Sequence, residues 1–345
     1  MATPSSPARR TRIDALVATG LVVRGTPLAR SIEGLLNGLH SDGSVATYSS
    51  DLVAYLRYCA ASGVDPLVAD RDHLQGYLAE TDDRGYAPDT RRRMLSVVRR
   101  MYAEAIERTA YRGANPADRL GRISGEPKPG EAALSAEETQ AMLDAAELRI
   151  ADPDSAASLR GRRDHLVLSF LVWTGLRAAE LAGIERGDIR SHGEYRVVEI
   201  TGKGDKGALV KLTDALDRLV ATYLETLDAA GIAVASDDPL FFGITRGTPP
   251  VVERRGGRIA PLTTRTIGRI VDEALKAVGR EGRRTSPHLL RRTSVTLVYQ
   301  ASHDVLLAQK HARHANGATT VKHYIKPLDD LADAGVDYIK LPERE

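Results

Sequence analysis

The sequence predicts a mainly α-helical protein with a small β-sheet, divided into a helical bundle and a mixed α/β domain. Apolar residues recur at helical spacing through residues 28–120. Farther along, the alternating and β-branched stretch Tyr195–Thr201 precedes a glycine-rich turn and a second apolar stretch, Ala208–Leu212, which is typical of a β-hairpin. Between these regions, residues 121–132 contain several glycines and prolines, which indicates a linker.

Length and composition allow two cores and exclude several classes of protein. The chain has 345 residues, of which 42% are hydrophobic. Its single cysteine, Cys59, excludes an intrachain disulfide and a cysteine-based zinc cluster, and favours a reducing cytoplasm. No run of 18 apolar residues is present, so we expect no membrane span. Residues 1–27 begin with a Ser/Pro/Arg-rich segment without an apolar signal core, and we interpret them as a disordered basic tail.

Residues 28–120 predict a bundle of four or five helices. An apolar stripe begins at Ile32 and continues to Leu39. Residues 47–60 and 70–79 show the same periodicity, and Pro88 suits the first turn of a long helix that extends to Ile106. Helices of this size bury their apolar faces against one another as a compact domain.

The long helix carries a concentrated positive charge. From Arg84 to Arg122 there are ten arginines against four acidic residues, although the whole chain has a net charge of only +2. A solvated helix face is the simplest interpretation, but a DNA phosphate backbone is the partner that such a stripe favours. The candidate DNA-binding residues here are Arg91, Arg92, Arg93, Arg99 and Arg100.

Residues 133–345 predict the second domain. Ser135 and Glu138 form a capping-box pattern for a helix that extends to Leu148, and residues 163–173 form a strongly apolar helix. Two more helices are predicted over 213–229 and 263–278. Between them, a Gly/Pro/Arg-rich loop over 243–262 exposes further basic residues, of which Arg254 and Arg255 are candidates for DNA contacts.

Two short segments of this domain pair an arginine with a second polar group. Ser286 and Pro287 begin a helix on which His288 and Arg291 lie three residues apart and so share a face. A proton-transfer group beside a fixed guanidinium suits a phosphate site, although a surface arginine beside a satisfied histidine has the same pattern. Gly175 ends the apolar helix, and Arg177 follows it with Glu180 on the same face. That pair is either half of a phosphate site or a simple ion pair.

Three segments of the second domain resemble the motifs of the tyrosine recombinases, the family of phage integrases, and they follow one another in the family's order. Residues 286–296 resemble the family's His-x-x-Arg box, and residues 174–181 resemble its first arginine box. Downstream, His314, Thr319-Thr320 and Tyr324 resemble its nucleophile segment. The resemblance implies a SAM-like core-binding bundle followed by a mixed α/β catalytic domain that clamps double-stranded DNA.

The resemblance also implies a role for each site residue. Tyr324 would be the nucleophile, Arg177 and Arg291 would bind the scissile phosphate, and Lys203 in the hairpin turn would protonate the leaving oxygen, with Lys206 as the alternate. His288 would act as an acid/base or hydrogen-bond partner, and His314 would contact the phosphate.

The sequence departs from the family pattern in two places. Arg292 stands where the family usually has a histidine after the box arginine, and His314 precedes Tyr324 by ten residues where nine is usual. His311 is therefore an alternative for the role of His314. Tyr299 and Tyr338 are alternative nucleophiles outside the matching segment.

The predicted function is site-specific DNA recombination through a 3′-phosphotyrosine and a Holliday junction. The alternatives are a type IB topoisomerase, which relaxes supercoils with similar residues, and a non-catalytic DNA-binding regulator on the same fold. Three nearby histidines without a carboxylate or cysteine at ligand spacing do not indicate a metal site, and we expect no cofactor. The resemblance implies a monomer in free solution and a homo-tetramer on paired target sites. In that tetramer, the amphipathic segment from Leu328 docks on a neighbouring copy.

A substitution at Tyr324 tests this assignment. Tyr324→Phe removes one oxygen, so it is expected to abolish covalent DNA adducts while leaving folding and DNA binding nearly intact. Adducts are measured by denaturing electrophoresis of protein incubated with labelled DNA. Adducts formed by the Phe variant would place the nucleophile elsewhere, with Tyr338 and Tyr299 next to be tested.

Overall fold

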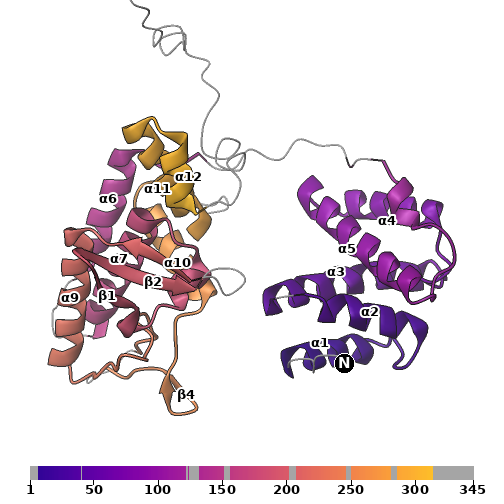
Figure 1. The fold of residues 1–345 in the computed structure, drawn as a ribbon, viewed down its shortest axis with the longest axis horizontal. Helices are drawn as coiled ribbons and strands as arrows, with labels where there is room; N and C mark the ends of the chain where they lie inside the picture. The colour runs from indigo at the N-terminus through magenta and orange to yellow at the C-terminus, as the bar shows by residue number, and fades with distance from the viewer. Residues whose placement is uncertain are drawn as a thin grey trace, which may run out of the picture. The chain divides into compact units, whose positions relative to one another are not determined.

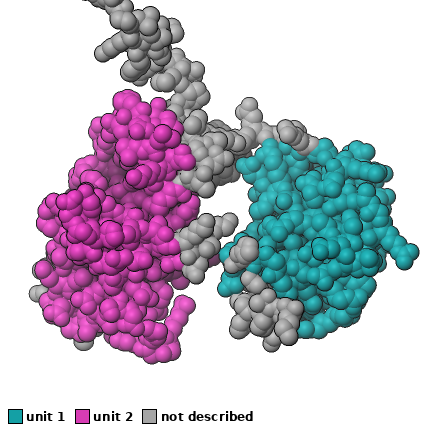
Figure 2. Space-filling view, in the orientation of Figure 1, with its two compact units in different colours: residues 1–130 teal, residues 131–345 magenta. Residues whose placement is uncertain are grey.

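The computed structural model describes residues 7–39, 41–121, 123, 132–150, 156–201, 207–245, 250–280 and 286–313. The chain divides into two compact units, Met1–Gly130 and Glu131–Glu345, which Figure 2 shows in different colours. We call them the N-terminal unit and the C-terminal unit.

The N-terminal unit is a bundle of helices (Figure 1). Thr26, Ser41 and Asp70 each accept a backbone N–H at the start of α2, α3 and α4, respectively. Pro27 follows Thr26 in the first turn of α2, and Pro88 occupies the first turn of α5, as predicted from the sequence. The elements are α1 (Pro7–Ala18), α2 (Pro27–Asn37), α3 (Asp42–Ala61), α4 (Arg71–Asp83), α5 (Pro88–Glu107) and the 3₁₀ helix η1 (Pro116–Arg119).

The core of this unit combines aliphatic residues with tyrosines, and the hydroxyl groups of Tyr55 and Tyr102 are hydrogen-bonded. Leu36, Leu52 and Tyr55 are fully buried between α2, α3 and α5. The Tyr55 and Tyr102 hydroxyls lie 2.6 Å apart, and the Tyr102 hydroxyl also donates to the Pro66 carbonyl at 2.7 Å. Because each of these buried hydroxyls has a partner, the bundle buries aromatic area without an unsatisfied polar group at this position.

The expectation of a disordered tail over residues 1–27 is wrong for residues 7–27. Helix α1 occupies Pro7–Ala18 and packs against α3, and Leu16 and Val22 are buried in the core. Ile13 and Leu16, three residues apart, form a short apolar stripe that the arginine-rich surroundings obscure in the sequence. Packing of this stripe against the core stabilises the helix.

The C-terminal unit is built around the apolar helix α7 (Ala156–Thr174), whose residues from Leu166 to Leu171 are buried. Helices α6, α9 and α11 pack against it. The other helices are α6 (Ala136–Glu147), α8 (Ala178–Ala182), η2 (Arg186–Asp188), α9 (Asp214–Ala229), α10 (Thr264–Lys276), α11 (Pro287–Ser302) and α12 (Val305–Ala312).

The small sheet of this unit has three antiparallel strands in the order β1-β2-β3: β1 (Ile189–His192), β2 (Tyr195–Thr201) and β3 (Gly207–Lys211). The hairpin of β2 and β3 was predicted, and its register pairs Thr201 with Gly207. Strand β1 and a two-stranded ribbon of β4 (Arg254–Arg255) and β5 (Arg258–Ile259) were not predicted, because such short strands carry little periodicity.

None of the helices in the part of the chain that the structure describes has the length and hydrophobicity needed to cross a lipid bilayer.

Candidate active site and nucleic-acid interface

The turn between α7 and α8 is the centre of the candidate site. Gly175 lies in the left-handed region with φ of +60°, and a Cβ atom there would lie 3.2 Å from His311 Nε2 and 3.3 Å from Ser294 Oγ. The turn therefore needs glycine both for its backbone conformation and for the close approach of α11 and α12. It places Arg177 directly before α8.

Arg177 and Glu180 form a closed pair at this turn. The backbone N–H of Arg177 donates to Glu180 Oε2 at 2.8 Å, and its Nη1 donates to Oε1 at 2.6 Å. The Arg177 side chain is 47% exposed, whereas that of Glu180 is only 6% exposed. Burial raises the pKa of Glu180, but the hydrogen bonds from Arg177 and the charge of Arg313 outweigh it, so the pKa lies below its ordinary value.

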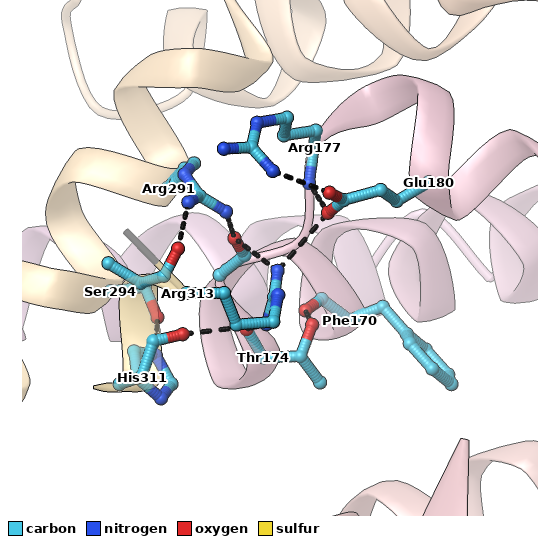
Figure 3. Close-up of polar contacts among 10 residues, drawn as sticks. Phe170, Thr174, Arg177, Glu180, Arg291, Ser294, His311 and Arg313 are labelled. Carbon is cyan, nitrogen blue, oxygen red and sulfur yellow. Dashed lines mark hydrogen bonds and ion pairs between the residues drawn. The ribbon is translucent and has the colours of Figure 1, made fainter. Parts of the chain in front are cut away.

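Arg291 reaches the same turn from α11 and is only 1% exposed. Its Nη1 donates to the Gly175 carbonyl at 2.5 Å, and its Nη2 donates to the Ala312 carbonyl at the end of α12. Figure 3 shows Arg177 and Arg291 entering the site from different helices. His288 lies in the first turn of α11 and is exposed. The structure thus brings both box arginines, which are 114 positions apart in the sequence, to one turn.

The sequence analysis missed Arg313, which immediately follows α12. Its Nη1 donates to the Thr174 carbonyl at 3.2 Å, and its Nη2 donates to Gly175 O at 3.3 Å and to Glu180 Oε2 at 3.1 Å. Glu180 is therefore shared by two arginines (Figure 3). Its position directly before His314 was the one sequence signal that pointed to Arg313.

His311, on α12, lies close to both α11 and the Gly175 turn. Its Nε2 is 2.7 Å from Ser294 Oγ on α11. Burial, together with the positive charges of Arg313 and Arg291, lowers the pKa of His311 to about 4. The imidazole is therefore neutral near pH 7, and its contacts suit a group that packs α12 against α11.

Several predicted site residues lie outside the described residues, namely Lys203, Lys206, His314, Tyr324 and Tyr338. Strand β2 ends at Thr201 and β3 begins at Gly207, on either side of the segment that contains Lys203 and Lys206. Helix α12 ends beside Gly175, shortly before His314 in the sequence. Tyr299 is half-buried on α11, where it packs against a small apolar cluster with Val295.

The predicted DNA-binding arginines of α5 are engaged within the N-terminal unit. Four of them pair with carboxylates: Arg91 with Asp82 (2.5 Å), Arg92 with Asp89 (2.6 Å), Arg93 with Asp51, and Arg99 with Asp118 (2.9 Å). Arg100 instead lies over the Tyr48 ring, 5.4 Å from its centroid, and Nη1 donates to the Tyr48 hydroxyl. In the C-terminal unit, Arg254 and Arg255 are exposed on β4. Among the described residues, no group of three or more His, Cys, Asp or Glu side chains is placed to hold a metal ion.

A helical bundle, a mixed domain with a small antiparallel sheet, and two arginines that converge beside the start of a tyrosine-bearing segment define a DNA-recombining enzyme. Residues 133–330 match the model of the phage integrase family, and residues 33–109 match that of its N-terminal SAM-like domain. The chain belongs to the phage integrase family and is a tyrosine recombinase.

Individual relatives support this assignment over most of the chain. The chain is 28% identical over 278 residues to tyrosine recombinase XerD of Caulobacter vibrioides, covering 80% of this chain and 84% of the relative. It is also 28% identical over 288 residues to tyrosine recombinase XerC of Corynebacterium efficiens, covering 81% of this chain and 80% of that relative.

Solved structures share the fold at 18% identity. XerH recombinase bound to a palindromic difH substrate gives a TM-score of 0.64, covering 96% of this chain and 94% of that one. A lambda integrase tetramer bound to a Holliday junction gives a TM-score of 0.60, covering 92% of this chain and 83% of that one.

The Arg93–Asp51 pair generates a stability prediction. Asp51 is 6% exposed, so Arg93→Ala leaves a buried carboxylate without its cation. We expect the free energy of unfolding of the N-terminal unit, measured by urea denaturation, to fall by about 1–3 kcal/mol.

The matched control is Arg100→Ala on the same helix. Arg100 is exposed and contacts a tyrosine rather than a carboxylate, so its loss is expected to lower the free energy of unfolding by less than about 1 kcal/mol. Equal effects of the two substitutions would contradict a structural role for the Arg93 pair. A loss of DNA affinity in Arg100→Ala can consequently be assigned to a phosphate contact more directly than one in Arg93→Ala, which also lowers stability.

The low pKa of His311 generates a pH prediction. The unfolded chain takes up a proton near the ordinary pKa of 6.5, whereas the folded chain takes it up only near pH 4. The free energy of unfolding of the C-terminal unit is therefore expected to fall as the pH drops from about 6.5 to about 4.

His311→Gln keeps a hydrogen-bonding side chain beside Ser294 but cannot titrate, so it is expected to flatten this pH dependence. His192→Gln, at an exposed position on β1, is the control and should behave as the original protein does. Chemical denaturation at a series of pH values makes the measurement. An unchanged slope in the His311 variant would mean that His311 is not the group responsible.

Proposed function

We propose that this tyrosine recombinase is a Xer-like enzyme that exchanges DNA strands at specific sites through a 3′-phosphotyrosine and a Holliday junction. The observation that supports the proposal most is the convergence of Arg177 and Arg291 on the Gly175 turn, beside the end of α12 from which the Tyr324 segment continues. Two guanidinium groups held at one point are suited to the non-bridging oxygens of a single phosphodiester.

In the proposed reaction, the Tyr324 hydroxyl oxygen attacks the scissile phosphorus. His288 accepts the hydroxyl proton as a bond forms between that oxygen and phosphorus. The bond from phosphorus to the 5′ oxygen breaks, and Lys203 donates a proton to the leaving 5′ oxygen. The phosphotyrosine ester retains the bond energy of the phosphodiester. The 5′ hydroxyl of the exchanged strand then attacks the ester and gives its proton back to Lys203, and His288 returns a proton to the departing tyrosine oxygen. Both groups are thereby restored, so no cofactor enters the cycle.

The arginines contribute by stabilising the charge that develops on the phosphate. In the DNA-free protein, the exposed guanidinium of Arg177 is held by the carboxylate of Glu180, which occupies donor positions that a phosphate would use. DNA binding exchanges that carboxylate contact for a phosphate contact. Arg291 enters the site already oriented by two backbone carbonyls, and this reduces the reorganisation needed in the transition state.

DNA outside the reacting phosphate is proposed to contact both units. On α5, Arg91, Arg92 and Arg99 contribute by giving up their carboxylate partners for phosphates. Arg254 and Arg255 on β4 contribute directly because they are exposed. Each phosphate neutralised adds about one unit to the slope of log affinity against log salt. Binding is therefore expected to weaken steeply with salt.

Assembly is proposed to follow DNA binding. The lambda integrase structure that shares this fold is a tetramer on a Holliday junction. We propose that this chain is a monomer in free solution and also forms a tetramer on paired sites. In that tetramer, contacts would run head to tail, with the segment from Leu328 docking on a neighbour. Leu306 and Leu307 on α12 are 73% and 46% exposed and are proposed to lie in the surface that receives it. We further propose that the enzyme works in the cytoplasm, where its DNA substrate is accessible.

The role of Lys203 provides the test of the reaction. Lys203→Ala is expected to slow cleavage of a normal phosphodiester by about 10²–10⁴-fold, since the leaving 5′ oxygen needs a proton. A substrate with sulfur in the 5′-bridging position leaves as a thiolate that needs no proton, and should recover most of the rate. The DNA site for this assay is obtained by covalent capture from a random-sequence pool.

Lys206→Ala, in the same turn, is the control and is expected to cleave both substrates at near the original rate. Equal defects of Lys203→Ala on the two substrates would reject Lys203 as the acid, and selective rescue of Lys206→Ala would assign the role to Lys206. Strand exchange between two captured sites distinguishes recombination from relaxation of supercoils by a topoisomerase.

A further inference from the structure

Arg313 has a backbone conformation that residues other than glycine rarely adopt. It follows α12 with φ of 52° and ψ of 42°, in the left-handed region, where residues other than glycine are strained. Such a conformation persists when surrounding contacts hold it. Its guanidinium supplies those contacts through the carbonyls of Thr174 and Gly175 and the carboxylate of Glu180, and its side chain is only 19% exposed.

Glu180 is bound from two sides. Its Oε1 accepts from the Arg177 guanidinium, and its Oε2 accepts from the Arg177 backbone N–H and from Arg313 Nη2 at 3.1 Å. The carboxylate is almost fully buried, and burial strongly disfavours an ionised carboxylate that lacks a cation. If one of the two arginines leaves Glu180, the other must therefore remain bonded to keep the carboxylate ionised.

The two arginines differ in their freedom to move. Arg177 is 47% exposed, whereas Arg313 is enclosed and bonded to two backbone carbonyls as well. Arg177 is accordingly the partner that can leave Glu180 for a DNA phosphate. Arg313 remains as the cation that keeps Glu180 ionised and in position (Figure 3).

We infer that Arg313 is a positioning residue for strand cleavage. It holds the Glu180 carboxylate while Arg177 moves onto the scissile phosphate, and it anchors the start of the segment that carries His314 and Tyr324 to the Gly175 turn. This inference rests on the proposed role of Arg177 in phosphate binding.

The charged surroundings of Glu180 support this assignment. Arg177 and Arg313 contact it directly, while Arg291 from α11 and His311 from α12 contact or adjoin the same Gly175 turn. Helix α10 and strand β2 also pack against α8, but among the described residues they supply no ion pair to Glu180. Arg313 is thus the one described cation that can replace Arg177 at this carboxylate.

The first experiment titrates Glu180 in the DNA-free full-length chain, following its side-chain carboxyl carbon by NMR. Arg313→Gly removes the cation and favours the left-handed backbone, so the fold is expected to be retained. The carboxyl should then titrate at higher pH than in the original protein, and Arg313→Lys should restore the lower value. Unchanged titration in Arg313→Gly would overturn the inference.

The second experiment follows covalent adduct formation against pH on the captured DNA site. Arg313→Gly is expected to move the acid limb of the rate profile to higher pH and to slow cleavage about tenfold within that limb, with recovery in Arg313→Lys. In a Glu180→Gln background, Arg313→Gly should have little further effect on the profile. An equal loss in both backgrounds would show that Arg313 does not act through Glu180.

Arg177→Ala separates this inference from the proposed function. If that variant forms adducts at the original rate, Arg177 does not bind the scissile phosphate. The proposed role of Arg313 in strand cleavage would then also be wrong. The Glu180 titration would still report whether Arg313 holds the carboxylate.

Discussion

The burial of the Arg291 guanidinium is the constraint on which the C-terminal unit depends. At 1% exposure, this cation has exchanged water for protein acceptors, and a buried guanidinium without them would be strongly destabilising. Its contacts with the carbonyls of Gly175 and Ala312 join α11 to the α7–α8 turn and to the end of α12. Three segments distant in the sequence are thereby held in one geometry. The small size of Gly175 and the added contacts of Arg313 follow from the same close approach.

The same requirement explains the arginines of the N-terminal unit. A dense row of positive charge on α5 would repel itself, and carboxylates from α3, α4 and η1 hold individual arginines in place. In the proposed complex, a DNA phosphate would replace the carboxylate partner of an α5 arginine. The affinity would then reflect the difference between the two contacts rather than the number of arginines.

Sequence patterns predicted what depends on local spacing and missed what depends on long-range contacts. Apolar periodicity predicted α2, α3 and α5, and the Ser135–Glu138 capping box and the β2–β3 hairpin formed as expected. The part played by Arg313 was not predictable, because it arises only when the end of α12 meets a turn 138 positions earlier in the chain. The pairing of Arg93 with Asp51 was missed for the same reason, since Asp51 lies on another helix.

Arg177 and Arg291 are proposed to bind one phosphate at the Gly175 turn while Arg313 stays bonded to Glu180. A structure of the full chain with an uncleaved DNA duplex tests this arrangement directly. We expect guanidinium nitrogens of Arg177 and Arg291 at about 3 Å from oxygens of the same scissile phosphate, with Arg313 still bonded to Glu180. A scissile phosphate bound elsewhere, with Arg177 still on Glu180, would contradict it.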